Sequence, residues 1–176
     1  MLGETSYGGS SLLRALAAMP VLTPVVGNGE QRFNPIHARD LADAVFRCLE
    51  TPPGPGPWEI GGPEEITQVG LIGLLRRWLG LSTRPMLRLP VAVARAVGNV
   101  GDLLQLGPIS ATSVSQLEHG VLANPQPLLE RIASRPKGVS LFMAERPAGT
   151  QDLWQARLYL LKPAVRLTLA LMWLVS

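Results

Sequence analysis

The chain has very few of the residues that form disulfides and metal sites. Its 176 residues include one cysteine, Cys48, and two histidines, His37 and His119. A single cysteine excludes an intramolecular disulfide scaffold and any all-cysteine metal site. Two histidines leave little for a histidine-rich metal centre. We therefore expect no metal in this protein.

Charged residues are also scarce, at 16% of the chain, whereas hydrophobic residues make up 47%. An intrinsically disordered chain is polar and highly charged, so this composition excludes disorder. Glycine and proline are frequent, with 18 and 16 residues, but they follow no three-residue period, which excludes collagen. The length allows one ordinary domain.

The net charge of +3 comes from the C-terminal part of the chain. Residues 131–176 hold seven basic and two acidic residues, whereas residues 1–130 hold nine basic and eleven acidic ones. The basic residues form no dense run and do not alternate with aromatic residues, so we expect no nucleic-acid partner. Two interpretations remain open, a solvated basic tail and the flank of a membrane helix.

The first residues carry no secretory signal. The stretch MLGETSYGGSS has no basic region and no apolar core of the kind that a signal peptide needs. Together with the single unpaired cysteine, this favours the cytoplasmic face of a membrane as the location.

Hydrophobic periodicity predicts a mixed α/β fold of helices and short strands. The clearest helix covers residues 40–50, with Asp40 as its N-cap and a buried apolar stripe formed by Leu41, Ala42, Val45, Cys48 and Leu49. Further helices are expected over residues 10–19, 67–79, 91–104, 112–119 and 127–133. Strands are expected over residues 21–27, 31–36, 58–62 and 86–90.

The C-terminal segment differs from the rest. From Thr150 the pattern is helical and increasingly apolar, and residues 167–176 carry no charge. Arg157, Lys162 and Arg166 precede this run, as cations flank a membrane helix on its cytoplasmic side. A bilayer span needs about 20 apolar residues, so ten reach half way. Either the helix docks on the domain, or, as we favour, residues 150–176 begin a transmembrane helix that the sequence truncates.

Three motifs occur in a fixed order along the first 65 residues. A Gly-Asn-Gly turn at residues 27–29 leads into Gln-Arg-Phe-Asn-Pro-Ile-His and then into Asp-Leu-Ala, ending at residue 42. A second motif, Trp-Glu-Ile-Gly-Gly-Pro-Glu, covers residues 58–64, and a Leu-Gly-Glu stretch with Tyr-Gly-Gly covers residues 2–9.

These motifs resemble the C-terminal part of extended and atypical short-chain dehydrogenase/reductases, the family of NAD-dependent epimerases and dehydratases. The resemblance covers residues 1 to about 140 and is nearest to the branch that includes the NAD(P)-binding accessory subunit of respiratory complex I. Some bacterial members of that branch continue into a DoxX-like membrane domain, which the segment from Lys162 onward resembles.

The resemblance implies that residues 1–145 are the substrate-side portion of a Rossmann-type fold whose N-terminal half is absent. It implies NAD or NADP as the cofactor of the parent protein, with none bound by this chain alone, and a small-molecule substrate. Gly3 and Tyr7 would lie at the nicotinamide edge. The residues implied on the substrate side are Arg32, Phe33, His37 and Asp40.

Two of these residues, His37 and Arg32, also have a purely structural interpretation. His37 precedes a helix N-terminus, whose dipole favours anions, but it can equally join the motif to the sheet through hydrogen bonds. An arginine near Arg32 contacts a phosphate in sugar-nucleotide members of the family, but here the spacing from Arg32 to His37 is one residue longer than usual. Arg32 can instead be a surface or ion-paired residue.

The motifs that an oxidoreductase of this family needs are missing from the sequence. There is no glycine-rich loop after a first strand, and no Tyr-x-x-x-Lys pair to act as general acid/base. Tyr159 and Lys162 are one residue too close. We therefore expect no catalytic residue in this chain. It is either an inactive piece of an NAD(P)-dependent protein or a non-catalytic, membrane-tethered binding module.

Overall fold

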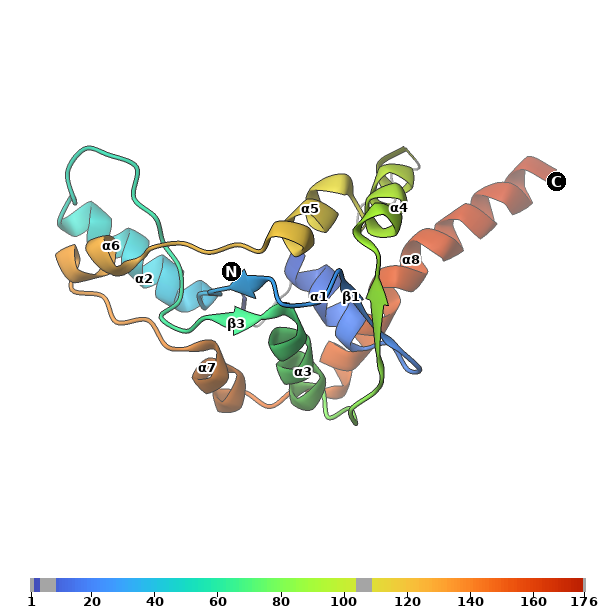
Figure 1. Ribbon diagram of the computed structural model, residues 1–176, viewed down its shortest axis with the longest axis horizontal. Coiled ribbons are helices and arrows are strands. Elements are labelled where there is room, and N and C mark those ends of the chain that lie inside the picture. The colour runs from blue at the N-terminus through green and yellow to red at the C-terminus, as the bar shows by residue number, and fades with distance from the viewer. Residues whose placement is uncertain (1, 4–8, 104–108, 176) are drawn as a thin grey trace.

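A computed structural model of the chain describes residues 2–3, 9–103 and 109–175, which fold into helices and four short strands (Figure 1). Tyr7, which the sequence analysis singled out, and residue 104, the expected end of a helix, lie outside the described residues. The helices are α1 (Gly9–Ala17), α2 (Ala38–Glu50), α3 (Gln68–Trp78), α4 (Val91–Leu103), α5 (Ala111–His119), α6 (Gln126–Arg131), α7 (Val139–Glu145) and α8 (Thr150–Val175). The strands are β1 (Thr23–Val26), β2 (Arg32–Phe33), β3 (Ile66–Thr67) and β4 (Met86–Leu89).

The described strands form two small pairs rather than one broad sheet. β1 and β4 are parallel, in a register that places Thr23 opposite Met86 and Val26 opposite Leu89. β2 and β3 are antiparallel. The expected mixed α/β class is thus confirmed in a mostly helical form with short parallel strands.

The main hydrophobic core surrounds α1, which packs against α3, α5 and α8 (Figure 1). On α3, Leu71, Ile72 and Leu75 are almost completely buried. Complete burial of such a side chain stabilises a fold by about 1.5–3 kcal/mol. The predicted helices over residues 10–19 and 67–79 are therefore confirmed, and both bury their apolar faces within this chain.

A small separate cluster joins α2 to α6. Its buried members are Ala44, Leu128 and Ile132. The apolar stripe predicted for α2 is wrong, because Val45 and Leu49 on that helix are 52% and 77% exposed. α2 uses its small residue Ala44 for packing, and no described residue covers the larger apolar side chains beside it.

Two predicted boundaries also change. The N-cap of α2 is His37 rather than Asp40, because the His37 Nδ1 atom accepts the Arg39 amide. Residues 58–62 form no strand. The Gly62 amide donates to the Asn34 carbonyl over 2.9 Å, and a Cβ atom at Gly62 would lie 2.1 Å from the Pro35 carbonyl oxygen. The segment thus meets the first motif through this contact at Gly62 and not through a ladder of strand hydrogen bonds.

Helix α8 begins against α1 and ends away from the rest of the molecule (Figure 1, red). Ala156 is buried, and Tyr159 and Leu160 pack against the main core. Beyond them the apolar side chains are exposed, from Leu167 at 50% to Trp173 at 82%. No helix within the described residues has the length and apolar character that a membrane crossing requires. The transmembrane helix expected from residue 150 is therefore not found.

Candidate functional site

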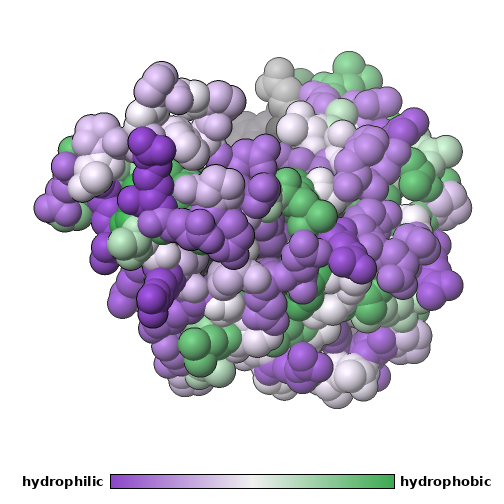
Figure 2. All heavy atoms as spheres, turned by 60° about the vertical axis from the view of Figure 1, so that its left-hand side comes forward, coloured by the Kyte–Doolittle hydropathy of each residue, from purple (hydrophilic) through white to green (hydrophobic). Residues whose placement is uncertain are grey.

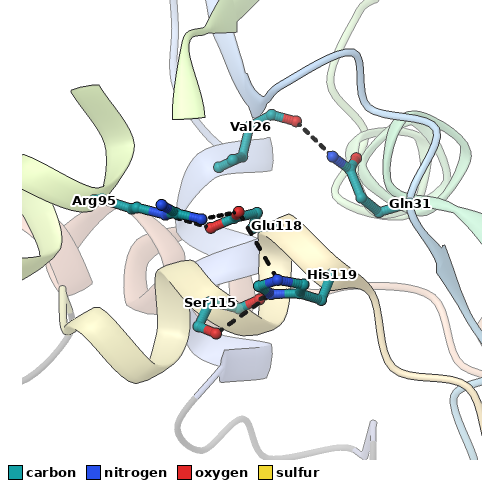
Figure 3. Close-up of polar contacts among 6 residues, drawn as sticks. All are labelled: Val26, Gln31, Arg95, Ser115, Glu118 and His119. Carbon is teal, nitrogen blue, oxygen red and sulfur yellow. Dashed lines mark hydrogen bonds and ion pairs between the residues drawn. The ribbon is translucent and has the colours of Figure 1, made fainter. Parts of the chain in front are cut away.

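The first motif begins with a tight turn between β1 and β2. Gly27 and Gly29 have φ values of 62° and 78°, a backbone conformation that glycine adopts without strain. The Gln31 side chain closes the turn by donating from Nε2 to the Val26 carbonyl over 3.2 Å (Figure 3). The turn directs β2 across the end of α5.

Asn34 fixes the strand after this turn to a distant part of the chain. Its Nδ2 atom donates to the Ala123 carbonyl over 2.9 Å, and its Oδ1 atom accepts the Ala123 amide over 3.0 Å. Asn34 is only 8% exposed, so both bonds are shielded from water. The side chain therefore acts as a short piece of strand that holds the α5–α6 loop beside the motif.

The motif, α1 and α5 together enclose a pocket of about 340 Å³, which we call the apolar pocket. Pockets for small ligands generally measure about 300–1,000 Å³. Its apolar wall includes Leu12, Leu13, Phe33, Ile60, Leu117 and Ala123.

Polar groups reach the apolar pocket from three directions. They are Ser10 of α1, Asn34 of the motif, and Ser113 and Gln116 of α5. None of the described residues that line the pocket carries a charge. Such a site suits a largely apolar molecule with one or two hydrogen-bonding groups, and it offers nothing to neutralise a diphosphate.

Of the residues predicted on the substrate side, Phe33 alone lines the apolar pocket. Arg32 points into solvent and pairs with Glu65, with 3.1 Å between Nη1 and Oε2. The two side chains are 64% and 54% exposed, so the pair contributes little to stability. The surface, ion-paired interpretation therefore describes Arg32 in this structure.

His37 and Asp40 lie at the start of α2, outside the apolar pocket. The His37 ring lies 5.0 Å from that of Phe142, between ring centroids. The Asp40 carboxylate accepts the Lys137 amide over 2.9 Å. Both side chains thus serve local structure, and the structure does not bring them together with Phe33.

The described residue at the predicted nicotinamide edge, Gly3, also has a structural role. Its carbonyl accepts a hydrogen bond from the buried Arg14 side chain. Burial is the largest effect on Arg14 and lowers the pKa of its guanidinium, while Asp152 opposes this shift. The Gly3 carbonyl thus holds α1 in place through its hydrogen bond with Arg14.

A polar cluster on α4 and α5 was not predicted from the sequence (Figure 3). Arg95 donates to Glu118 from two nitrogen atoms, one of them at 2.8 Å, and this contact lowers the pKa of the Glu118 carboxyl. His119 lies beside Glu118, with 3.9 Å between Nε2 and Oε1. The cluster borders a cavity of about 280 Å³. Because Arg95 and Glu118 are 23 residues apart, no local spacing could have revealed the pair.

The same cluster contains serine, histidine and glutamate, but its geometry does not suit nucleophilic catalysis. The His119 Nδ1 atom lies 3.0 Å from the Ser115 backbone carbonyl and 3.4 Å from the Ser115 hydroxyl. A proton on Nδ1 that is donated to the carbonyl leaves that atom unable to accept the hydroxyl proton. The cluster is therefore better suited to joining α4 to α5.

Tyr159 does not have the environment of a catalytic tyrosine. Burial raises the pKa of its phenol, and a hydrogen bond with Ser11 only partly opposes this effect. A tyrosine that acts as general base needs a lowered pKa. Lys162 is exposed one turn further along α8. The described residues also contain no group of three or more metal-binding side chains.

The three cations predicted to flank a membrane helix, Arg157, Lys162 and Arg166, are all exposed along α8. Arg157 lies within the part of α8 that packs on the core, whereas Lys162 and Arg166 lie between that part and the exposed apolar end. Their role at a membrane stays a prediction.

Comparisons with known proteins give a distant structural likeness. No family model matches the chain, and no curated protein matches it. The structure is similar to that of UDP-glucuronic acid 4-epimerase from Bacillus cereus in complex with NAD, at 15% sequence identity and a TM-score of 0.36. The match covers 77% of this chain and 39% of the epimerase, so the chain spans about two fifths of that protein's length.

Proposed function

We propose that this chain forms the substrate-side part of an NAD(P)-dependent protein related to short-chain dehydrogenases, and that the apolar pocket receives the substrate. The observation that carries this proposal is the position of the pocket, which is walled by Phe33 and Asn34 of the family-like motif. The chemistry on the nicotinamide belongs to residues outside this chain, because the sequence lacks the glycine-rich loop and the Tyr-x-x-x-Lys pair.

The pocket narrows the class of substrate. Four uncharged polar side chains face an otherwise apolar wall, so a small hydroxylated or carbonyl-bearing molecule with an apolar body is favoured over a sugar nucleotide. Arg32 does not add a phosphate contact here, since its guanidinium pairs with Glu65.

The test uses ligand-observed NMR with small hydroxylated aromatic and aliphatic compounds, and NADH fluorescence in parallel. Ala123→Phe fills the pocket while retaining the backbone bonds to Asn34, and Leu122→Phe adds the same ring at the 52% exposed neighbour. We expect at least about tenfold weaker compound binding in Ala123→Phe and unchanged binding in Leu122→Phe.

Two results would count against the proposal. One is the absence of saturable binding by any of these compounds. The other is tight NADH binding by this chain that Ala123→Phe removes, since the pocket would then belong to a cofactor.

A second candidate function is association of α8 with a lipid bilayer, which the exposed apolar residues from Leu167 to Leu174 favour. The nine helical residues from Leu167 to Val175 rise about 13 Å, which is less than half of a hydrocarbon core of about 30 Å. Shallow insertion would leave Lys162 and Arg166 among the headgroups.

Co-sedimentation with phosphatidylcholine vesicles tests this idea. The double substitution Leu171→Gln with Leu174→Gln should abolish binding to the vesicles. Val21→Gln, at an exposed position outside α8, should leave that binding unchanged.

A further inference from the structure

A small pocket where α1, α3 and α8 meet carries three arginines. It measures about 110 Å³ and is bordered by residues 18–20 after α1, by Arg76 of α3, by Ser82 and Arg84 of the α3–β4 loop, and by Arg157 of α8. We call it the arginine pocket. None of the described residues that line it is acidic.

Arg76 is the fixed part of this pocket. It is 4% exposed, and its Nη1 atom donates to the carbonyls of Ala17 and Met19 over 2.6 and 2.9 Å. Its Nε and Nη2 atoms donate to the Ser82 carbonyl over 3.0 and 2.7 Å. Carbonyls at a helix C-terminus repel anions, and here Arg76 neutralises them, so the pocket keeps a positive field.

Arg84 and Arg157 supply the solvent-facing part of the pocket. Both are exposed, and neither makes an ion pair or a hydrogen bond with the described residues. Arg84 lies near enough to Arg76 to help burial in lowering the pKa of that guanidinium. Like charges held together without a counter-ion favour the binding of an anion.

We propose that the arginine pocket binds a phosphate group. Its volume is several times the roughly 10–15 Å³ that one water needs, which leaves room for a tetrahedral oxyanion. Guanidinium groups match the oxygen atoms of phosphate through paired N–H donors. The phosphate comes either from a free small molecule or from an anionic lipid headgroup near α8. This site depends on neither function proposed above.

The experiment uses the complete chain in a phosphate-free buffer of low ionic strength. Calorimetric titration with inorganic phosphate forms one arm, and co-sedimentation with phosphatidylcholine vesicles, with and without phosphatidic acid, forms the other. The variants are Arg84→Gln and Arg157→Gln. The controls are Arg77→Gln, exposed on α3 outside the pocket, and Arg88→Gln, exposed on β4 outside the pocket. Circular dichroism confirms that each variant folds.

We expect binding to weaken about tenfold in each pocket variant and to stay within about twofold of wild type in both controls. If the pocket variants bind inorganic phosphate more weakly, the natural ligand is a free small molecule. If they lose binding only to the vesicles that contain phosphatidic acid, the ligand is a lipid headgroup. Either result supports the site. The proposal is overturned if the pocket variants bind like the wild type in both arms. Equal weakening by Arg77→Gln or Arg88→Gln would overturn it too, because diffuse positive charge would then explain the binding.

Discussion

Arg76 shows how one buried cation can organise three chain segments. It donates to carbonyls at the end of α1, after α1, and in the loop that follows α3. Each carbonyl lies where a helix or loop leaves it without a backbone partner. A single guanidinium therefore supplies the hydrogen-bond donors that several separate side chains would otherwise have to provide.

We expect Arg76→Met to lower the free energy of unfolding by at least about 3 kcal/mol, because it leaves the buried Ala17 carbonyl and the partly buried carbonyls of Met19 and Ser82 without this donor. Arg77→Met is the matched control, since Arg77 is the exposed next residue of α3 and should change stability by less than about 0.5 kcal/mol. Urea-unfolding midpoints measure both. Equal effects of the two substitutions would show that the Arg76 contacts add no stability.

The Glu118 carboxyl should titrate below its ordinary pKa near 4.5, because Arg95 donates to its charged form. A lowered folded-state pKa means that the pair stabilises the fold above the unfolded-state value and that this stabilisation is lost as pH falls through the folded-state pKa. In Arg95→Gln the midpoint, followed by carboxyl carbon NMR, should rise toward 4.5. Arg88→Gln, on β4, should leave it unchanged.

At the scale of elements, the sequence predicted helices better than their packing. Helix α3 begins where the pattern over residues 67–79 predicted a helix, and the Thr67 hydroxyl caps it by accepting the Gly70 amide over 3.1 Å. Such a cap depends on residues three positions apart, so local sequence is sufficient to predict it. Helix α7 was missed, because its seven residues give too little periodicity to recognise.

The orientation of α2 could not be predicted, because it depends on which residues far along the chain pack against it. The periodicity of the helix offered a wide apolar face that includes Val45 and Leu49, but α6 contacts Ala44. The exposed apolar groups on this side remain separate from one another among hydrophilic ones (Figure 2).

We expect Ala44→Leu to destabilise the protein by about 1–3 kcal/mol, because Ala44 is 1% exposed and packs against Leu128 and Ile132. Leu49→Gln, on the exposed side of the same helix, should change stability by less than about 0.5 kcal/mol. Thermal unfolding followed by fluorescence compares them. A larger loss in Leu49→Gln would mean that α2 faces the other way.

The candidate site was predictable only in part. The motif located Phe33, which does line the apolar pocket. The α5 side of that pocket, with Ser113 and Gln116, depends on the Asn34 contact to Ala123, and the two residues are 89 positions apart. The resemblance grouped Arg32, His37 and Asp40 with Phe33, but their side chains bind partners outside the apolar pocket instead. Their substrate-side role stays a prediction.

At the scale of the whole molecule, a large core and smaller clusters give unequal local stability. The main core includes Leu71, Ile72 and Leu75, whereas the cluster between α2 and α6 has three buried members. Regions with few buried apolar contacts open at lower free-energy cost.

Backbone amides of α2 and α6 should therefore exchange with deuterium sooner than those of α1 and α3, in peptides resolved by mass spectrometry. The opening of α2 and α6 would be local, since the main core does not require them. Equal protection across all four helices would contradict this expectation and would indicate one cooperative unit.

The pairing of Asn34 with Ala123 has a consequence for synthesis on the ribosome. The 89 residues between them take about 4–18 s to add at roughly 5–20 residues per second. During that time, the motif strand lacks its partner from the α5–α6 loop. Nascent chains stopped before residue 123 therefore present the apolar pocket residues to solvent, which makes them targets for chaperones.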